Sequence, residues 1–139
     1  MRDSDLDPFA AVLEFHRKLG VHVEPRPGFP ADAVVTLRLS LLHEEMAELE
    51  RAIADRDMVE VADALADLVY VAYGSAISFG IDLRPVFEEV HRSNMAKVGG
   101  GSRADGKVLK PSDWTPPRIR ELLEDMRLDV EAADSGTDE

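Results

Sequence analysis

Carboxylate side chains with helical spacing fall in two neighbouring stretches of this chain, and they are the residues best suited to chemistry. The acids of the first stretch lie within one helical turn and are Glu44, Glu45 and Glu48. Those of the second recur at i, i+3 and i+7, on one helix face, and are Glu60, Asp63 and Asp67. Ionised carboxylates that are buried together cost several kcal/mol each unless positive charge lies among them. Because hard divalent cations prefer oxygen ligands, the two stretches predict a site for Mg²⁺ or Mn²⁺.

Two helices joined by a tight turn are expected to position these acids. Apolar residues recur at helical spacing over residues 31–54, and a nearly all-apolar helix is predicted over 58–79. The connection Asp55–Asp57 is short enough to require an antiparallel hairpin. Folding the chain there sets Glu48 opposite residues 60–64 and Glu45 opposite residues 63–67, so the two acidic stripes meet.

The remaining elements are also helical, so the predicted fold class is all-α: a helical bundle built on the antiparallel hairpin. A first helix is predicted over 8–19, capped by Asp7 and ended by Gly20. Further helices are predicted over 83–98 and 117–130, separated by a glycine-rich loop. Residues 1–130 are predicted to form a single domain, and the small, acidic tail 131–139 is predicted to be disordered.

Composition narrows the function. The net charge of −12 argues against non-specific binding to a nucleic-acid backbone. The absence of cysteine excludes disulfides and thiolate metal sites, and it favours a cytoplasmic location. The apolar run 61–79 contains Asp63 and Asp67, which are expensive in lipid, so we expect a buried helix and no membrane span.

A locally basic segment, 91–110, contains one acid, Asp105. Its candidate phosphate-binding residues are Asn94, Lys97, Lys107 and Lys110. The alternative is that Lys97 compensates a helix dipole and that the loop lysines are merely solvated; spacing alone does not separate the two interpretations. Combined with carboxylates that hold a metal, the basic segment fits a nucleoside polyphosphate. A Walker P-loop is absent from the sequence.

The acids and histidines also have structural interpretations. Paired glutamates are common on solvated helix faces, and Glu60 can complete a capping box with Asp57. His43 is expected to be structural or at the surface. His91 completes a single Glu-x-x-His motif, whereas a di-iron bundle needs two, so a ferritin-like centre is disfavoured.

The motif EExxE followed by ExxD on paired helices resembles the MazG-like, all-α nucleoside triphosphate pyrophosphohydrolases. Residues 44–82 carry the core of the resemblance, and 90–97 with 105–111 resemble the phosphate-binding half. The chain is most similar to bacterial MazG-like proteins assigned as dUTP pyrophosphatases. The resemblance implies metal ligation by Glu45, Glu48, Glu60 and Asp63. It implies a phosphate-binding role for Asn94, Lys97, Lys107 and Lys110.

Glu44 would be a further ligand, or would orient and deprotonate the attacking water. Asp67, which precedes Leu68, can equally be the motif's aspartate, and Ala64 then occupies its glutamate position. We favour Asp63 in the motif and keep Asp67 as a ligand of a second site or as a supporting group.

The reaction implied by the resemblance is metal-dependent hydrolysis of the α–β phosphoanhydride of dUTP to dUMP and pyrophosphate, in house-cleaning of the nucleotide pool, by a homodimer or higher homo-oligomer. Other substrates, such as another nucleoside triphosphate or phosphoribosyl-ATP, remain open. A non-catalytic regulatory protein that binds metal or nucleotide, or a purely structural helical oligomer, would contain the same helices. No sequence motif identifies the preferred base or sugar.

Overall fold

The computed structural model describes residues 5–136, which are helical apart from their connections and one isolated β-bridge between Ser102 and Val108. The helices are α1 (Pro8–Leu19), α2 (Asp32–Ala54), α3 (Met58–Ser78), α4 (Leu83–Met95) and α5 (Ile119–Ser135). This confirms the all-α class. The chain divides into two compact units, Met1–Asp82 and Leu83–Glu139. The single domain over 1–130 stays a prediction.

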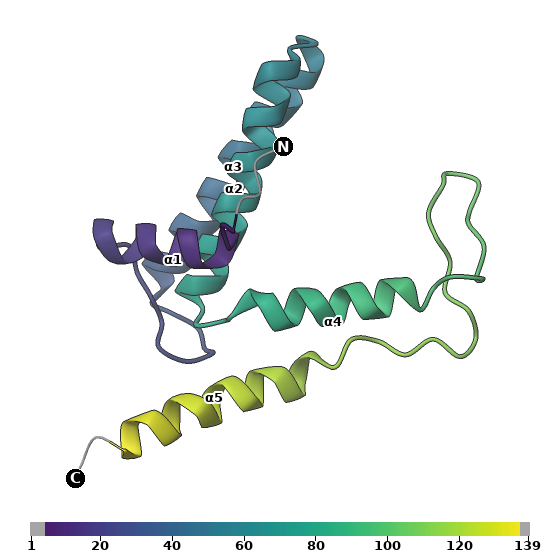
Figure 1. Cartoon of the computed structure of the whole chain (residues 1–139). Coiled ribbons are helices and arrows are strands. Elements are labelled where there is room, and N and C mark those ends of the chain that lie inside the picture. Colours follow the sequence, from purple (N-terminus) through teal and green to yellow (C-terminus); the bar gives the residue numbers. More distant parts are fainter. Residues whose placement is uncertain (1–4, 137–139) are drawn as a thin grey trace. The chain divides into compact units, whose positions relative to one another are not determined.

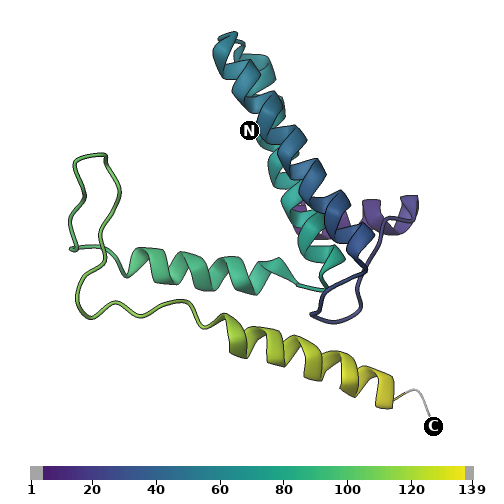
Figure 2. The ribbon, with the colours of Figure 1, turned by 180° about the vertical axis from the view of Figure 1, so that it is seen from behind.

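The first unit is the predicted antiparallel hairpin with α1 packed against it. Helices α2 and α3 run side by side in opposite directions, and α1 crosses near the end of the hairpin that lies away from the α2–α3 turn (Figures 1 and 2). Local capping explains the helix starts: the Asp7 carboxylate accepts from the Phe9 amide at 3.0 Å, and Asp57 accepts from the Val59 amide at 3.1 Å. The core is small and consists of Phe9, Val12, Ala52, Ala64, Ala76 and Ile77.

Helix α3 is less buried than its composition predicts. Apolar residues along it remain exposed, among them Val59, Leu65 and Val69, because α1 and α2 cover only part of its circumference. By length and composition, α3 alone among the described helices qualifies as a candidate membrane span; the core helix of a soluble protein passes the same test. Its two aspartates keep the membrane interpretation unfavourable.

The second unit contains α4 and α5, which pack antiparallel to each other (Figures 1 and 2). Helix α4 ends at Met95, short of the predicted residue 98, because the following amides form tighter turns, such as Lys97 to the Asn94 carbonyl at 3.1 Å. Helix α5 begins at Ile119 and continues to Ser135. The predicted disorder from residue 131 is therefore wrong as far as Ser135, and 137–139 lie outside the described residues.

Hydrogen bonds attach the segment between α4 and α5 to α4. The Trp114 indole donates to the Ser93 carbonyl at 2.7 Å, and the Glu89 carboxylate accepts from Arg92 at 2.8 Å and from the Arg118 amide at 3.0 Å. These bonds, led by the one from Arg92, lower the pKa of Glu89 to about 2. Glu89 is thus tied into an ion pair with Arg92.

Candidate metal centre

Three carboxylates from the two helices of the hairpin come together. Glu45 and Glu48 come from adjacent turns of α2, and Asp67 comes from α3. One oxygen of each lies within 4.8 Å of the others. The turn sets this register: Arg56 adopts a positive φ of 54°, and Glu45 and Asp67 lie equally far along the chain from it. This is a spacing at which three carboxylates can share one cation.

The carboxylates of this cluster repel one another, which shows in their pKa values. Burial raises the pKa of Glu45, and the neighbouring charges of Glu48 and Asp67 raise it further. The pKa of Asp67 is also raised, by burial and then by Asp63 and Glu48. Within the described part of the chain, Glu45 Oε2 is buried and has no hydrogen-bond partner. A buried carboxylate oxygen without a donor, among further carboxylates, fits a cation ligand.

The other predicted acids lie around this cluster. Asp63 is exposed one turn before Asp67, near enough to raise the pKa values of both Asp67 and Glu45. Glu60 lies with Glu48 in a separate hollow of about 210 Å³ beside the α2–α3 turn. Its position in the first turn of α3 is capped by Asp57, whose carboxylate accepts from the Glu60 amide at 3.2 Å. Glu44 is exposed and outside the cluster.

The register also explains a feature of the motif. Ala64, which is only 2% exposed, occupies the α3 position opposite Glu48. If Asp67 is the aspartate of the ExxD motif, Ala64 occupies the position of the motif's glutamate. The hairpin therefore pairs Glu45 with Asp67, and it leaves a methyl group where a fourth carboxylate of that motif would stand.

A pocket of about 370 Å³ adjoins the carboxylates and includes Glu45 and Asp67 in its wall. Its apolar walls are Phe15, Leu37, Leu41 and Tyr70. The rings of Phe15 and Tyr70 meet edge to face, with centroids 5.5 Å apart and an interplanar angle of 85°. A volume of this size, with charge at one end and aromatic walls, is typical of a small-molecule site.

Two buried polar side chains, Arg38 and His16, complete the pocket. Arg38 is 6% exposed; its Nε donates to Ser75 Oγ at 3.2 Å and its Nη2 donates to the Val71 carbonyl at 3.0 Å. His16 is 2% exposed, and its Nδ1 lies 3.2 Å from the His22 carbonyl. Burial lowers the pKa of both groups. Sequence reasoning missed this pair, although Arg38 interrupts the apolar face of α2 two turns before Glu45, and that interruption was a usable signal.

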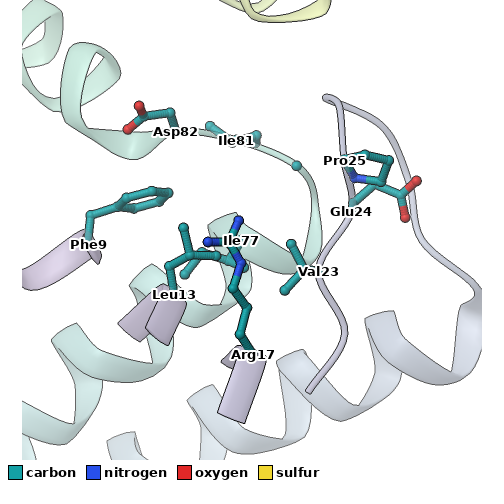
Figure 3. Close-up of a pocket in the computed structure, with 10 residues that line it drawn as sticks. Phe9, Leu13, Arg17, Val23, Glu24, Pro25, Ile77, Ile81 and Asp82 are labelled. Atoms are coloured by element: carbon teal, nitrogen blue, oxygen red, sulfur yellow. The ribbon is translucent and has the colours of Figure 1, made fainter. Parts of the chain in front are cut away.

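A second hollow, of about 180 Å³, lies elsewhere in the first unit, between α1, the segment that follows it and the end of α3 (Figure 3). Arg17 extends along its wall beside Leu13, and Glu24 lies across from it. The Glu24 carboxylate is engaged by His22 Nε2 at 2.8 Å. This hollow contains none of the clustered carboxylates, so it is not part of the candidate metal centre.

The predicted phosphate-binding residues belong to the second unit, and most of them gather at Trp114. Lys97 Nζ donates to Asn94 Oδ1 at 2.8 Å and lies 5.7 Å from the Trp114 ring centroid. Lys110 Nζ lies over the same ring at 4.3 Å. Lys107 lies apart in the exposed loop, where its backbone amide donates to Asp105 at 3.2 Å. The fold thus assembles Asn94, Lys97 and Lys110 into one cationic group.

Comparison with known proteins places the hairpin in a family. Residues 12–94 match the family model of phosphoribosyl-ATP pyrophosphohydrolase. The chain belongs to the phosphoribosyl-ATP pyrophosphohydrolase family. This family is related to the MazG-like superfamily that the motifs resemble. The match covers all six predicted acids and the pocket beside them; it ends before Lys97, Lys107 and Lys110.

An uncharacterized protein of Acanthamoeba polyphaga mimivirus is 36% identical to the chain over 87 residues. The similarity covers 54% of the present chain and 32% of the viral protein. The chain therefore matches about a third of that relative's length.

Proposed function

We propose that the protein is a metal-dependent nucleotide pyrophosphohydrolase that cleaves the α–β phosphoanhydride and releases a nucleoside monophosphate and pyrophosphate. The observation that carries this proposal is the convergence of Glu45, Glu48 and Asp67 beside a pocket large enough for a nucleoside. The family match, which spans both features, supports the same reaction class.

Glu45, Glu48 and Asp67 would be the ligands of Mg²⁺ or Mn²⁺. The cation would give the buried Oε2 of Glu45, which has no hydrogen-bond partner among the described residues, a positive partner. A divalent cation bound there supplies a water of lowered pKa and positive charge for phosphate oxygens. Asp63 and Glu60 remain proposed ligands or water-holding groups at the edge of the cluster. Glu44, which lies outside it, remains the proposed group that orients water, and that role requires it to act from the exposed side of α2.

The pocket would hold the nucleoside, with the base against Phe15 and Tyr70 and the phosphates directed toward the carboxylates. Asn94, Lys97, Lys107 and Lys110 remain the proposed phosphate ligands, a role that follows from the resemblance. Lysines suit it because they are point-charge donors on flexible stems.

We propose dUTP as the substrate, on the overall sequence resemblance, with a role in house-cleaning of the nucleotide pool in the cytoplasm. Phosphoribosyl-ATP is the second candidate, and the description of the matching family favours it. A homodimer is proposed as well, because exposed apolar residues of α3, such as Leu65 and Val69, need a covering surface.

The test is pyrophosphate release, with orthophosphate release as control, from the common dNTPs and NTPs and from phosphoribosyl-ATP, each with Mg²⁺ and with Mn²⁺. Pyrophosphate from dUTP alone supports both the reaction and the substrate. Pyrophosphate from another compound keeps the reaction and refutes dUTP. Metal or nucleotide binding without any pyrophosphate release refutes the proposal that the protein is an enzyme. It supports the alternative of a non-catalytic protein that binds metal or nucleotide.

A further inference from the structure

Arg38 is a buried charged side chain in the pocket wall, two turns of α2 before Glu45. We infer that Arg38 is the specificity-determining residue of the pocket and that it selects nucleobases that present carbonyl oxygens. This inference rests on the proposed function, because it assumes that the pocket holds the nucleoside.

The guanidinium is held in one orientation by α3. Its Nε donates to Ser75 Oγ and its Nη2 to the Val71 carbonyl. Ser75 Oγ in turn donates to the same Val71 carbonyl at 2.8 Å, which fixes the hydroxyl. Arginine has five N–H donors. These two bonds use two of them, so three remain without a hydrogen-bond partner among residues 5–136.

Gly74 makes this placement possible. A Cβ at Gly74 would lie 2.5 Å from Arg38 Nη2 and 2.7 Å from His16 Nε2. The absence of a side chain therefore lets the guanidinium and the imidazole both lie directly on the α3 backbone. The Val71 carbonyl and the Ser75 hydroxyl of α3, rather than an acidic side chain, hold the buried cation, so its charge stays available to a ligand.

The distance along the helix suits a nucleoside. Arg38 and Glu45 are seven residues apart on one face of α2, which corresponds to about 10.5 Å along the axis. Leu41 and Tyr70 line the pocket between these ends. A nucleotide whose phosphate lies at Glu45 and Asp67 therefore directs its base along the apolar walls toward Arg38.

The chemistry at that end is donor-rich. A guanidinium donates and never accepts. The His22 carbonyl can only accept, so the Nδ1 of His16 beside it carries the proton, and burial keeps the ring neutral by lowering its pKa. The Nε2 of His16 is then an acceptor, so the donors at this end of the pocket come from Arg38. Fixed donors recognise adjacent acceptor atoms, as arginine does on guanine. Uracil and guanine present such carbonyls, whereas the amino group of adenine would face the guanidinium with a donor.

The experiment compares the wild type with Arg38→Gln and Ser75→Ala in kcat and KM for dUTP, dGTP and dATP, with Mn²⁺ present. We expect the wild type to prefer dUTP or dGTP over dATP by about 10- to 100-fold in kcat/KM, the range of one charge-assisted hydrogen bond. Arg38→Gln should remove the preference, mainly through KM, because glutamine offers both a donor and an acceptor. Ser75→Ala should reduce it in part, because one anchor of the guanidinium is lost.

Thermal melting and Mn²⁺ titration of each variant show that the fold and the metal centre are intact. An unchanged base preference in folded Arg38→Gln overturns the inference. If Arg38→Gln does not fold, the decision passes to Ser75→Ala, where an unchanged preference overturns it. If the wild type releases no pyrophosphate from any nucleotide, the proposed function fails. The inference is then judged by binding of dUMP against dAMP: equal binding by the wild type refutes it, and a preference that Arg38→Gln abolishes supports it.

Discussion

Substitution of Asp67 by asparagine should move stability in opposite directions with and without metal. The change keeps the shape of the side chain and removes one of the three carboxylates that lie within 4.8 Å of one another. In the metal-free protein it relieves repulsion, and the new amide can donate to the unpartnered Glu45 Oε2. With metal present it removes a ligand. A residue with a purely structural role would not produce this reversal.

The size of the effect follows from the spacing. Two unit charges 4.8 Å apart repel by about 3.5 kcal/mol at an effective dielectric constant of 20, and by about 0.9 kcal/mol in bulk water. Glu48 is exposed and Glu45 and Asp67 are only partly buried, so the value lies toward the aqueous limit, about 1 kcal/mol for each pair. Asp67 faces both glutamates. Asp67→Asn should therefore stabilise the metal-free protein by about 2 kcal/mol, or about 8 °C in Tm.

The assay is thermal unfolding followed by circular dichroism at neutral pH and low salt, first in EDTA and then with saturating Mn²⁺. Asp63→Asn is the matched control: it also removes one aspartate charge, but from an exposed side chain outside the 4.8 Å group, so its shift in EDTA should be smaller. High salt should reduce the gain of Asp67→Asn. A lower Tm for Asp67→Asn in EDTA, or a metal-induced rise in Tm equal to that of the wild type, would refute the reasoning.

Three further outcomes follow from the same structure. The pKa values of Glu45 and Asp67 are raised above their ordinary 4.5 and 3.8. Their favourable contribution is therefore complete below those values and is lost as the pH rises through the raised pKa values. Urea unfolding in EDTA should show the free energy of unfolding falling over that window, and Glu45→Gln should flatten the fall; a rise would contradict the assignment. Gly74→Ala should destabilise by about 1–3 kcal/mol despite the better helix propensity of alanine, because its Cβ overlaps Arg38; an unchanged urea midpoint would show that the guanidinium moves freely. Asp57→Ala should cost about 1 kcal/mol through loss of the α3 cap, and thermal melting without a shift in Tm would count against that role.

The hairpin could be predicted from the sequence because several local signals indicate the same structure. Periodic apolar residues, the Asp57 cap and a three-residue connection all specify the same antiparallel pair. The sequence could not choose between Asp63 and Asp67, because both lie on one helix face four residues apart. The choice depends on the register of α2 against α3, which is set at the turn that contains Arg56.

Features that depend on tertiary packing were beyond sequence reasoning. Arg38 could be noticed as an interruption of the apolar face of α2, but its burial requires Gly74 to lie opposite it, and neither residue signals the other along the chain. The same holds for Trp114, which organises Lys97 and Lys110 through its hydrogen bond to Ser93. The extension of α5 to Ser135 shows a different limit, because acidic composition suggested disorder in a segment that continues a helix.

The most direct test of the central claim, that the Glu45–Glu48–Asp67 cluster is a metal-dependent catalytic centre, is pyrophosphate release from dUTP with Mg²⁺ by the wild type and by Glu48→Gln, at matched concentrations of folded protein. We predict release by the wild type that EDTA abolishes, and a loss of at least about 100-fold in Glu48→Gln, as expected when a metal-based catalytic contribution of several kcal/mol is lost. Wild-type turnover in folded Glu48→Gln, or release that persists in EDTA, would contradict the account.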